Sequence, residues 1–209
     1  MSRLLYVEGS PRKQRSRSIK VAKCFLEEYE RYHPSDEISI MDLWGLDLPE
    51  INGNVLDAKY NILHGRESTQ EQKKSWKSVE DVISLFLQGD KLLFSLPMWN
   101  FGIPYRLKHF FDVIVQPGYT FSFSAERGYE GLLSSRKACM IFARGGEYSS
   151  EEASAYDIQK RYMYNILGFM GITELSSIIV EPTLQASQEE LEKVMRTAED
   201  QARRISKDF

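Results

Sequence analysis

Several features that define large protein classes are scarce in this 209-residue sequence. No apolar run approaches the roughly 18 residues of a membrane-spanning helix, and the opening MSRLLYVEGS has too short an apolar run for a signal peptide. The only two cysteines, Cys24 and Cys139, form no C-x-x-C pair, so we expect free thiols. The three histidines show no metal-ligand spacing. We therefore expect a cytoplasmic protein without a metal site.

Two nucleotide-binding motifs are also missing. Neither G-x-G-x-x-G nor G-x-x-x-x-G-K-[ST] follows the first apolar segment, which argues against a standard dinucleotide fold and a Walker-type NTPase. The net charge of −3 is unlike the basic surplus of nucleic-acid-binding proteins. Cations nevertheless crowd into one short connection near the start of the chain, PRKQRSR at residues 11–17. This concentration predicts a small anionic ligand for that connection.

Strand-like segments alternate with amphipathic helical segments along the chain. The apolar patterns predict five strands, at residues 3–9, 36–43, 90–97, 137–144 and 174–181. They predict five main helices, beginning at Ser18 and then at 69–88, 104–115, 152–168 and 188–206, and Thr69 with Gln72 has the spacing of a capping box at the start of the second. Residues 44–68 lack clear periodicity apart from a short helix near 54–63, and 119–124 alternate like a hairpin arm. The alternation predicts an α/β protein, with a doubly wound five-stranded parallel sheet, helices on both faces and a single domain over residues 1–209.

In such a sheet the ligand lies beyond the carboxyl ends of the strands. The first loop, residues 9–18, leads from the first strand into a helix whose N-terminal N–H groups carry partial positive charge. Hydroxyls of Ser10, Ser16 and Ser18, with guanidinium groups beside them, favour a monophosphate site there. A solvated basic loop with a serine N-cap would have the same composition.

The second loop, residues 95–104, places aromatic residues directly after a buried strand, where a turn is normally polar. Met98, Trp99 and Phe101 offer a stacking surface for a flat ring, and Asn100 offers an amide to a heterocycle. The alternative is that these side chains simply cover the end of the sheet.

The third loop, residues 143–150, contains the pair Gly145 and Gly146. A backbone without side chains suits a close approach to a ring or a hydroxyl chain, although a simple chain reversal would also use glycine. Together the three loops predict one ligand with a phosphate and a planar ring. Flavin mononucleotide (FMN) has that shape and charge.

At these residues the sequence resembles the FMN-dependent NADH-azoreductases, also described as NADH:quinone oxidoreductases. The resemblance covers nearly the whole chain and is carried by the segments SPRKQRSRS, PMWNFGIPYRLKHFFDVI, GYTFSFS with GYEGLL, ARGG and LGFMGI. It implies a flavodoxin-like fold, a homodimer, one tightly bound FMN per subunit, and NADH as the reductant of a quinone or azo substrate.

The resemblance also implies which residues hold FMN. The phosphate would be held by Ser10, Ser16, Arg17 and Ser18. The isoalloxazine and ribityl groups would be held by Met98, Trp99, Asn100, Phe101, Ala143, Arg144, Gly145 and Gly146. Three positions depart from the family pattern, which often has tyrosine at Trp99, serine at Ala143 and glutamine at Arg17.

The expected activity is ping-pong hydride transfer through the flavin, without a separate nicotinamide domain. We assign no catalytic side chain, and expect His109 to face solvent or a partner subunit. Tyr119 and Phe121 fit either a wall of the substrate site or packing within a hairpin. The alternatives are a flavodoxin-type electron carrier, disfavoured by the mild net charge and the basic first loop, and a flavin-free interaction protein.

Overall fold

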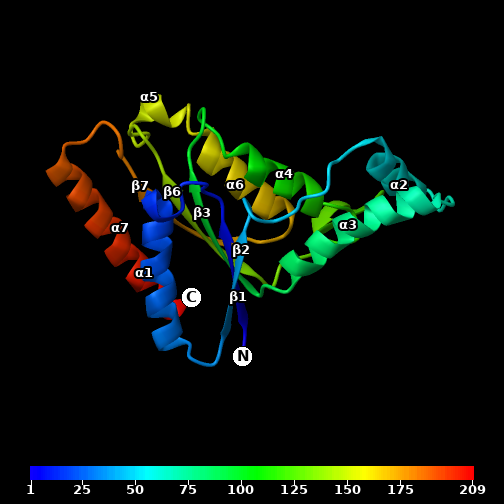
Figure 1. Cartoon of the computed structure of the whole chain (residues 1–209), viewed down its shortest axis with the longest axis horizontal. Helices are drawn as coiled ribbons and strands as arrows, with labels where there is room; N and C mark the ends of the chain where they lie inside the picture. Colours follow the sequence, from blue (N-terminus) through cyan, green and yellow to red (C-terminus); the bar gives the residue numbers. More distant parts are fainter.

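Five parallel strands form the central sheet of the computed structural model, which describes residues 1–209 (Figure 1). They are β1 (Arg3–Glu8), β2 (Glu37–Asp42), β3 (Lys91–Pro97), β6 (Lys137–Ala143) and β7 (Glu174–Val180). Their order across the sheet is β2-β1-β3-β6-β7. The strand order reverses between β1 and β3, and at such a switch point adjacent loops diverge and leave a crevice. The predicted doubly wound sheet is confirmed.

Helices cover both faces of this sheet, because alternate strand residues point to opposite sides. On one face α1 (Arg17–Tyr32) and α7 (Gln188–Asp208) lie side by side over a core that includes Leu4 and Tyr6 (Figure 1). The other face, which includes Leu5 and Val7, is covered by α3 (Gln70–Leu87), α4 (Tyr105–Ile114) and α6 (Ile158–Phe169).

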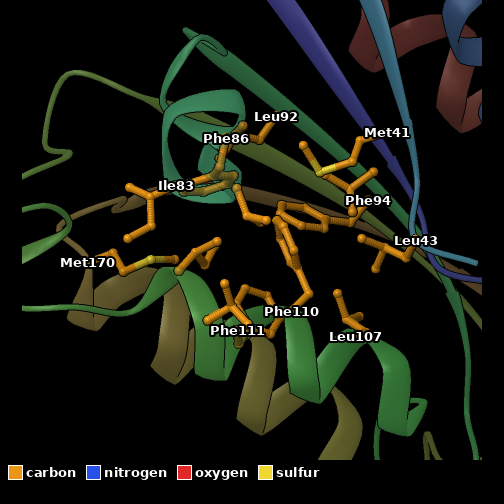
Figure 2. Packing of buried hydrophobic residues seen from close by; sticks show 14 of the residues in the cluster. Met41, Leu43, Ile83, Phe86, Leu92, Phe94, Leu107, Phe110, Phe111 and Met170 are labelled. Carbon is orange, nitrogen blue, oxygen red and sulfur yellow. The ribbon is translucent and has the colours of Figure 1, made fainter. Parts of the chain in front are cut away.

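Aromatic side chains fill the larger of the two cores. Figure 2 shows Phe94 of β3 facing Phe110 and Phe111 of α4, with Phe86 of α3 beside them. The ring centroids of Phe94 and Phe111 lie 6.1 Å apart, and those of Phe86 and Phe110 lie 5.8 Å apart. These contacts hold α4 against β3 and so fix the start of α4 next to the end of that strand.

Several of these elements lie where the sequence patterns predict them. The predicted capping box of α3 is present, with Gln72 N–H donating to the Thr69 hydroxyl and Thr69 N–H donating to the Gln72 side chain. The expected short helix is α2 (Gly53–Leu63), which packs on α3 away from the sheet (Figure 1). The expected hairpin consists of β4 (Phe121–Ser124) and β5 (Gly128–Gly131). None of the helices is both long and apolar enough to cross a membrane.

The helix predicted at residues 152–168 is interrupted. It consists of a short α5 (Glu151–Ser154) and a separate α6, and Asp157 caps the second by accepting from Lys160 N–H at 2.9 Å. The other carboxylate oxygen of Asp157 pairs with the buried guanidinium of Arg144. The interruption therefore coincides with an N-cap residue whose carboxylate also pairs with a buried cation.

A buried polar network closes the amino-terminal edge of the sheet. Asp36 accepts from the N–H of Ser2 at 2.7 Å, from the Tyr29 hydroxyl at 2.7 Å and from Lys91 Nζ at 3.1 Å. These donors, the Ser2 N–H foremost, hold the pKa of Asp36 well below its ordinary value. The network joins the chain start, α1 and β3, at the edge of the sheet opposite the three loops.

Candidate functional site

The first, second and third loops meet at the carboxyl edge of the sheet. The N–H of Gly9 donates to the carbonyl of Ser95 at 2.8 Å, which joins the first loop to the end of β3. The N–H of Met98 donates to the carbonyl of Ala143, also at 2.8 Å, which joins the second loop to the third. Because β1, β3 and β6 are neighbours in register, their ends bring these segments together.

The first loop places three serine side chains in the interior at the start of α1. Ser10, Ser16 and Ser18 are all buried. Ser16 is the N-cap, accepts from Ile19 N–H at 3.5 Å, and its hydroxyl lies 3.1 Å from that of Ser18. The N–H groups of Arg17 and Ser18 begin the helix and have no acceptor within it. Hydroxyls and N–H groups thus lie together where the helix dipole favours an anion.

The cations of this loop have different environments. Lys13 forms ion pairs with Glu8 at 2.6 Å and with Asp42, so it joins the ends of β1 and β2. Partial burial acts against its charge, but the two carboxylates raise the pKa of Lys13 above its ordinary value. Arg12 and Arg15 are exposed, and Arg17 is half-buried beside Ser16 and Ser18. Of the three arginines in this loop, Arg17 is the least exposed and is the first residue of α1.

The second loop contains a tight reverse turn from Trp99 to Gly102. Trp99 N–H donates to the Gly102 carbonyl at 3.0 Å, and Gly102 N–H donates back at 2.9 Å. The two central residues, Asn100 and Phe101, have φ values of 48° and 67°, as in a type I′ turn. This region suits asparagine but costs about 1–2 kcal/mol for a residue such as phenylalanine. The N–H groups of Asn100 and Phe101 have no backbone acceptor.

A third aromatic residue, Trp44, joins this site from the connection after β2. Its ring centroid lies 5.8 Å from that of Trp99 and 5.5 Å from that of Tyr105, and its Nε1–H donates to the Gly9 carbonyl at 3.1 Å. The sequence patterns gave no reason to select Trp44. The only sequence feature that could have selected Trp44 is its place two positions after β2, which matches the place of Trp99 after β3.

Helix α4 ties down the beginning of that connection. Arg106 donates from Nε to the Leu43 carbonyl at 2.8 Å. His109 Nε2 lies 2.9 Å from the Pro49 carbonyl, so this histidine is half-buried against its own chain rather than free in solvent. His109 therefore supports the loop that carries Trp44 and lies outside the candidate site.

The third loop presents two glycines whose N–H groups have no backbone acceptor, Gly145 and Gly146. Arg144 differs from them. Its guanidinium is buried and pairs with Asp157 and Glu181, and its N–H donates to the Val180 carbonyl at 3.0 Å. Of the predicted residues of this loop, the glycines therefore offer free backbone donors, whereas the guanidinium of Arg144 faces acidic side chains of the protein.

Tyr119 and Phe121 lie away from the three loops of their own chain. They follow α4, a ten-residue helix that starts near the carboxyl edge of the sheet and spans about 15 Å. The Tyr119 hydroxyl donates to Glu80 on α3 at 2.6 Å, and the Phe121 ring lies 4.8 Å from that of Phe169. Within one chain, Tyr119 packs against α3 and Phe121 packs beside Phe169, and neither forms a wall of the candidate site.

Known proteins resemble this chain over nearly its whole length. A model of the flavodoxin-like fold matches residues 2–204. An FMN-dependent NADH:quinone oxidoreductase from Desulfotalea psychrophila is 45% identical over 209 residues, covering 100% of this chain and 98% of that relative. The chain belongs to this flavodoxin-like family. A second FMN-dependent NADH:quinone oxidoreductase, from Nitratidesulfovibrio vulgaris strain DP4, is 40% identical over 210 residues, with complete coverage of both chains.

Solved structures of the flavodoxin-like family share the whole architecture. An azoreductase from Bacillus anthracis strain Sterne superposes with a TM-score of 0.92 at 27% identity, covering 100% of both chains. A B. anthracis FMN-dependent NADH-azoreductase in complex with FMN superposes with a TM-score of 0.87, also at 27% identity, over 99% of this chain and 100% of that one. The family resemblance and the flavodoxin-like fold predicted from the sequence are both confirmed.

Proposed function

We propose that this protein is an FMN-dependent NAD(P)H oxidoreductase that reduces quinones and aromatic azo compounds. The observation that carries the proposal is the meeting of three loops at the switch point of the sheet, each with polar donors unused by the protein. Relatives across the whole chain are named as NADH:quinone oxidoreductases and azoreductases. These names argue against a flavodoxin-type electron carrier, which is the alternative expected from the fold alone.

The first loop fits the phosphate of FMN. Three buried serine side chains and the first N–H groups of α1 provide hydroxyl and amide donors, and the half-buried Arg17 adds a cation at the first position of the helix. No carboxylate caps this helix start, and the nearby acids Glu8 and Asp42 are paired with Lys13. An anion with several acceptor oxygens would satisfy these donors.

The second and third loops fit the isoalloxazine ring. Asn100 and Phe101 on one side, and Gly145 and Gly146 on the other, have backbone N–H groups free to donate to ring heteroatoms. When bound, FMN would supply the redox chemistry, the two-electron exchange between NADH and the acceptor. The N–H groups of Gly145 and Gly146 would hold the ring and stabilise negative charge on it, because the fold orients them in advance.

The aromatic residues of the second loop line the mouth of the candidate site. Trp99 is 37% exposed and Phe101 is 47% exposed, so both present apolar surface at the mouth of the site. Their role is to stack against a flat acceptor and to exclude water from it. Trp44 and Tyr105 support Trp99 from behind, with centroid distances of 5.8 and 6.2 Å.

We also propose a homodimer in which the β4–β5 hairpin completes the partner's site. Tyr119 and Phe121 lie too far from the three loops of their own chain, and the hairpin exposes large aromatic surface at Phe123 and Tyr129. A second copy would cover this surface and bring Phe121 next to the quinone or azo substrate in the partner's site.

We further propose a cytoplasmic location, because the two free thiols are typical of proteins in a reducing compartment.

The activity is tested by anaerobic reduction of the purified flavoprotein. NADH should bleach the visible absorbance of the bound flavin, NADPH provides the comparison, and benzoquinone should restore the absorbance. Protein that takes up no FMN, or that is bleached by neither nucleotide, would refute the proposal.

The homodimer is tested by mixing two defective chains. One carries the phosphate-site change Ser18→Ala and the other carries Phe121→Ala. If the hairpin acts on the partner, the mixed dimer has one site with both defects and one intact site, so activity rises on mixing. If the hairpin acts on its own chain, every site keeps one defect and activity does not rise.

A further inference from the structure

We propose that Arg144 is a positioning residue that holds the second and third loops in the conformation that receives FMN, and is not itself an FMN ligand. The inference rests on the proposed function, because it assigns a cause to the geometry of that site. It differs from the role implied by the family resemblance, in which Arg144 lines the flavin. The contacts of the side chain, its backbone and its neighbours support this role.

The guanidinium of Arg144 is buried and contacts three side chains of the protein. The residue is 1% exposed, and its Nη1 donates to Glu181 Oε2 at 3.2 Å. Its Nη2 lies 2.8 Å from Asp157 Oδ2, in an ion pair whose angle falls outside hydrogen-bond geometry. Its Nε donates to Gln159 Oε1 at 3.1 Å. All three partners are themselves largely or fully buried, so the cation is surrounded by fixed acceptors.

The backbone of Arg144 is fixed as firmly as its side chain. Its N–H donates to the Val180 carbonyl at 3.0 Å, and its carbonyl accepts from Thr183 N–H at 2.9 Å and from the Thr183 hydroxyl at 2.8 Å. The carbonyl of Gly145 accepts from Leu184 N–H at 3.0 Å. These bonds leave the N–H groups of Gly145 and Gly146 as the free donors of the loop.

Gln159 extends this arrangement to the second loop. Its N–H donates to the Phe101 carbonyl at 2.8 Å, while its side chain accepts from Arg144. Phe101 has a φ of 67°, a conformation that persists only when surrounding contacts hold it. The chain of contacts from Arg144 through Gln159 to Phe101 therefore connects the third loop to the strained turn of the second. One cation fixes both sides of the proposed ring site.

Near-isosteric changes around Arg144 test this role without opening a cavity. Asp157→Asn removes a charge from the guanidinium but keeps an N-cap oxygen for α6, since asparagine caps helices well. Gln159→Met removes the acceptor of Arg144 Nε but keeps the backbone bond to Phe101. Glu152→Gln is the matched control, because it removes one exposed carboxylate from the neighbouring α5.

The readouts are the dissociation constant of FMN, from quenching of flavin fluorescence, and the midpoint potential of the bound flavin. Asp157→Asn and Gln159→Met should each weaken FMN binding by about 10-fold, the lower end of what loss of a supporting hydrogen-bond partner costs at metal sites, and should shift the potential. Glu152→Gln should change neither. Circular dichroism at the assay temperature shows whether each variant is folded.

A merely structural role would lower the melting temperature and leave the dissociation constant and the potential of the folded protein unchanged. That result in both variants would overturn the positioning role while leaving the FMN assignment intact. Wild-type protein that fails to bind FMN would instead refute the proposed function, and this inference with it.

Discussion

The phosphate site can be tested by a pair of substitutions that separate ligand affinity from stability. Ser18→Ala removes a buried hydroxyl whose partner within the protein is the Ser16 hydroxyl at 3.1 Å. Ser16 keeps its bond to Ile19 N–H, so the helix cap survives. Arg17→Ala removes a half-buried cation that forms no ion pair within the chain. We therefore expect the fold of the double variant to be intact.

The effect on FMN affinity should be much larger than the effect on stability. A hydrogen bond to a charged group contributes about 1.5–3 kcal/mol, and a partly exposed ion pair adds about 0.5–1 kcal/mol. Their sum, about 2–4 kcal/mol, corresponds to a loss of roughly 30-fold or more in affinity, at 1.4 kcal/mol per tenfold. The contribution of Arg17 should shrink at high salt, because partly exposed charges are screened.

The assay is titration of apoprotein with FMN, followed by flavin fluorescence, with urea unfolding of the same apoprotein as the measure of stability. Arg12→Ala is the matched control, since it removes an exposed cation from the same loop. The reasoning is refuted if the double variant binds FMN as tightly as the wild type, or if Arg12→Ala weakens binding as much as the double variant does.

Three further outcomes test the packing, the electrostatics and the substrate site. Gly131→Ala should destabilise the protein by about 2 kcal/mol or more, because its Cβ would lie 2.1 Å from the nitrogen of Gly171. Gly53→Ala is the control for thermal melts and should not destabilise the protein in this way, since no atom lies within 4 Å of its Cβ. The lowered pKa of Asp36 means that this carboxylate stabilises the fold above its unfolded-state pKa of about 3.9 and that the contribution is lost as pH falls through the folded-state value. Asp36→Asn should therefore lower the free energy of unfolding at neutral pH and weaken its acid dependence between about pH 5 and pH 2, and an unaltered acid limb in urea titrations would contradict this. Trp99→Tyr should raise kcat/KM for a bulky bicyclic quinone by about 3- to 10-fold relative to benzoquinone, because the smaller ring widens the site; equal changes for both quinones would argue against Trp99 as its wall.

The sequence was informative wherever the relevant interaction is local. A capping box joins residues three apart, so Thr69 and Gln72 located the start of α3 without any tertiary information. Buried parallel strands read as short apolar runs, and the residues that follow them must lie at one edge of the sheet. That reasoning was enough to select the three loops and to propose a phosphate and a flat ring between them.

The contacts that charged and aromatic side chains make were decided by the tertiary structure. Lys13 and Arg144 lie in loops that suggested ligand binding, yet Lys13 pairs with Glu8 and Asp42, and Arg144 pairs with Asp157 and Glu181. Most of these partners are far away in the sequence and meet only because of the strand order and register. No local pattern encodes such a meeting.

Periodicity and turn chemistry thus determined the α/β class, the element order and the loops that form the candidate site, because each depends on residues close together in the chain. Only the folded structure decided that Trp44 enters the site, that Arg144 pairs with the residue between α5 and α6, and that Tyr119 and Phe121 lie at the far end of α4. These outcomes depend on distances between segments that the sheet brings together or keeps apart, and the spacing of residues along the chain does not contain them.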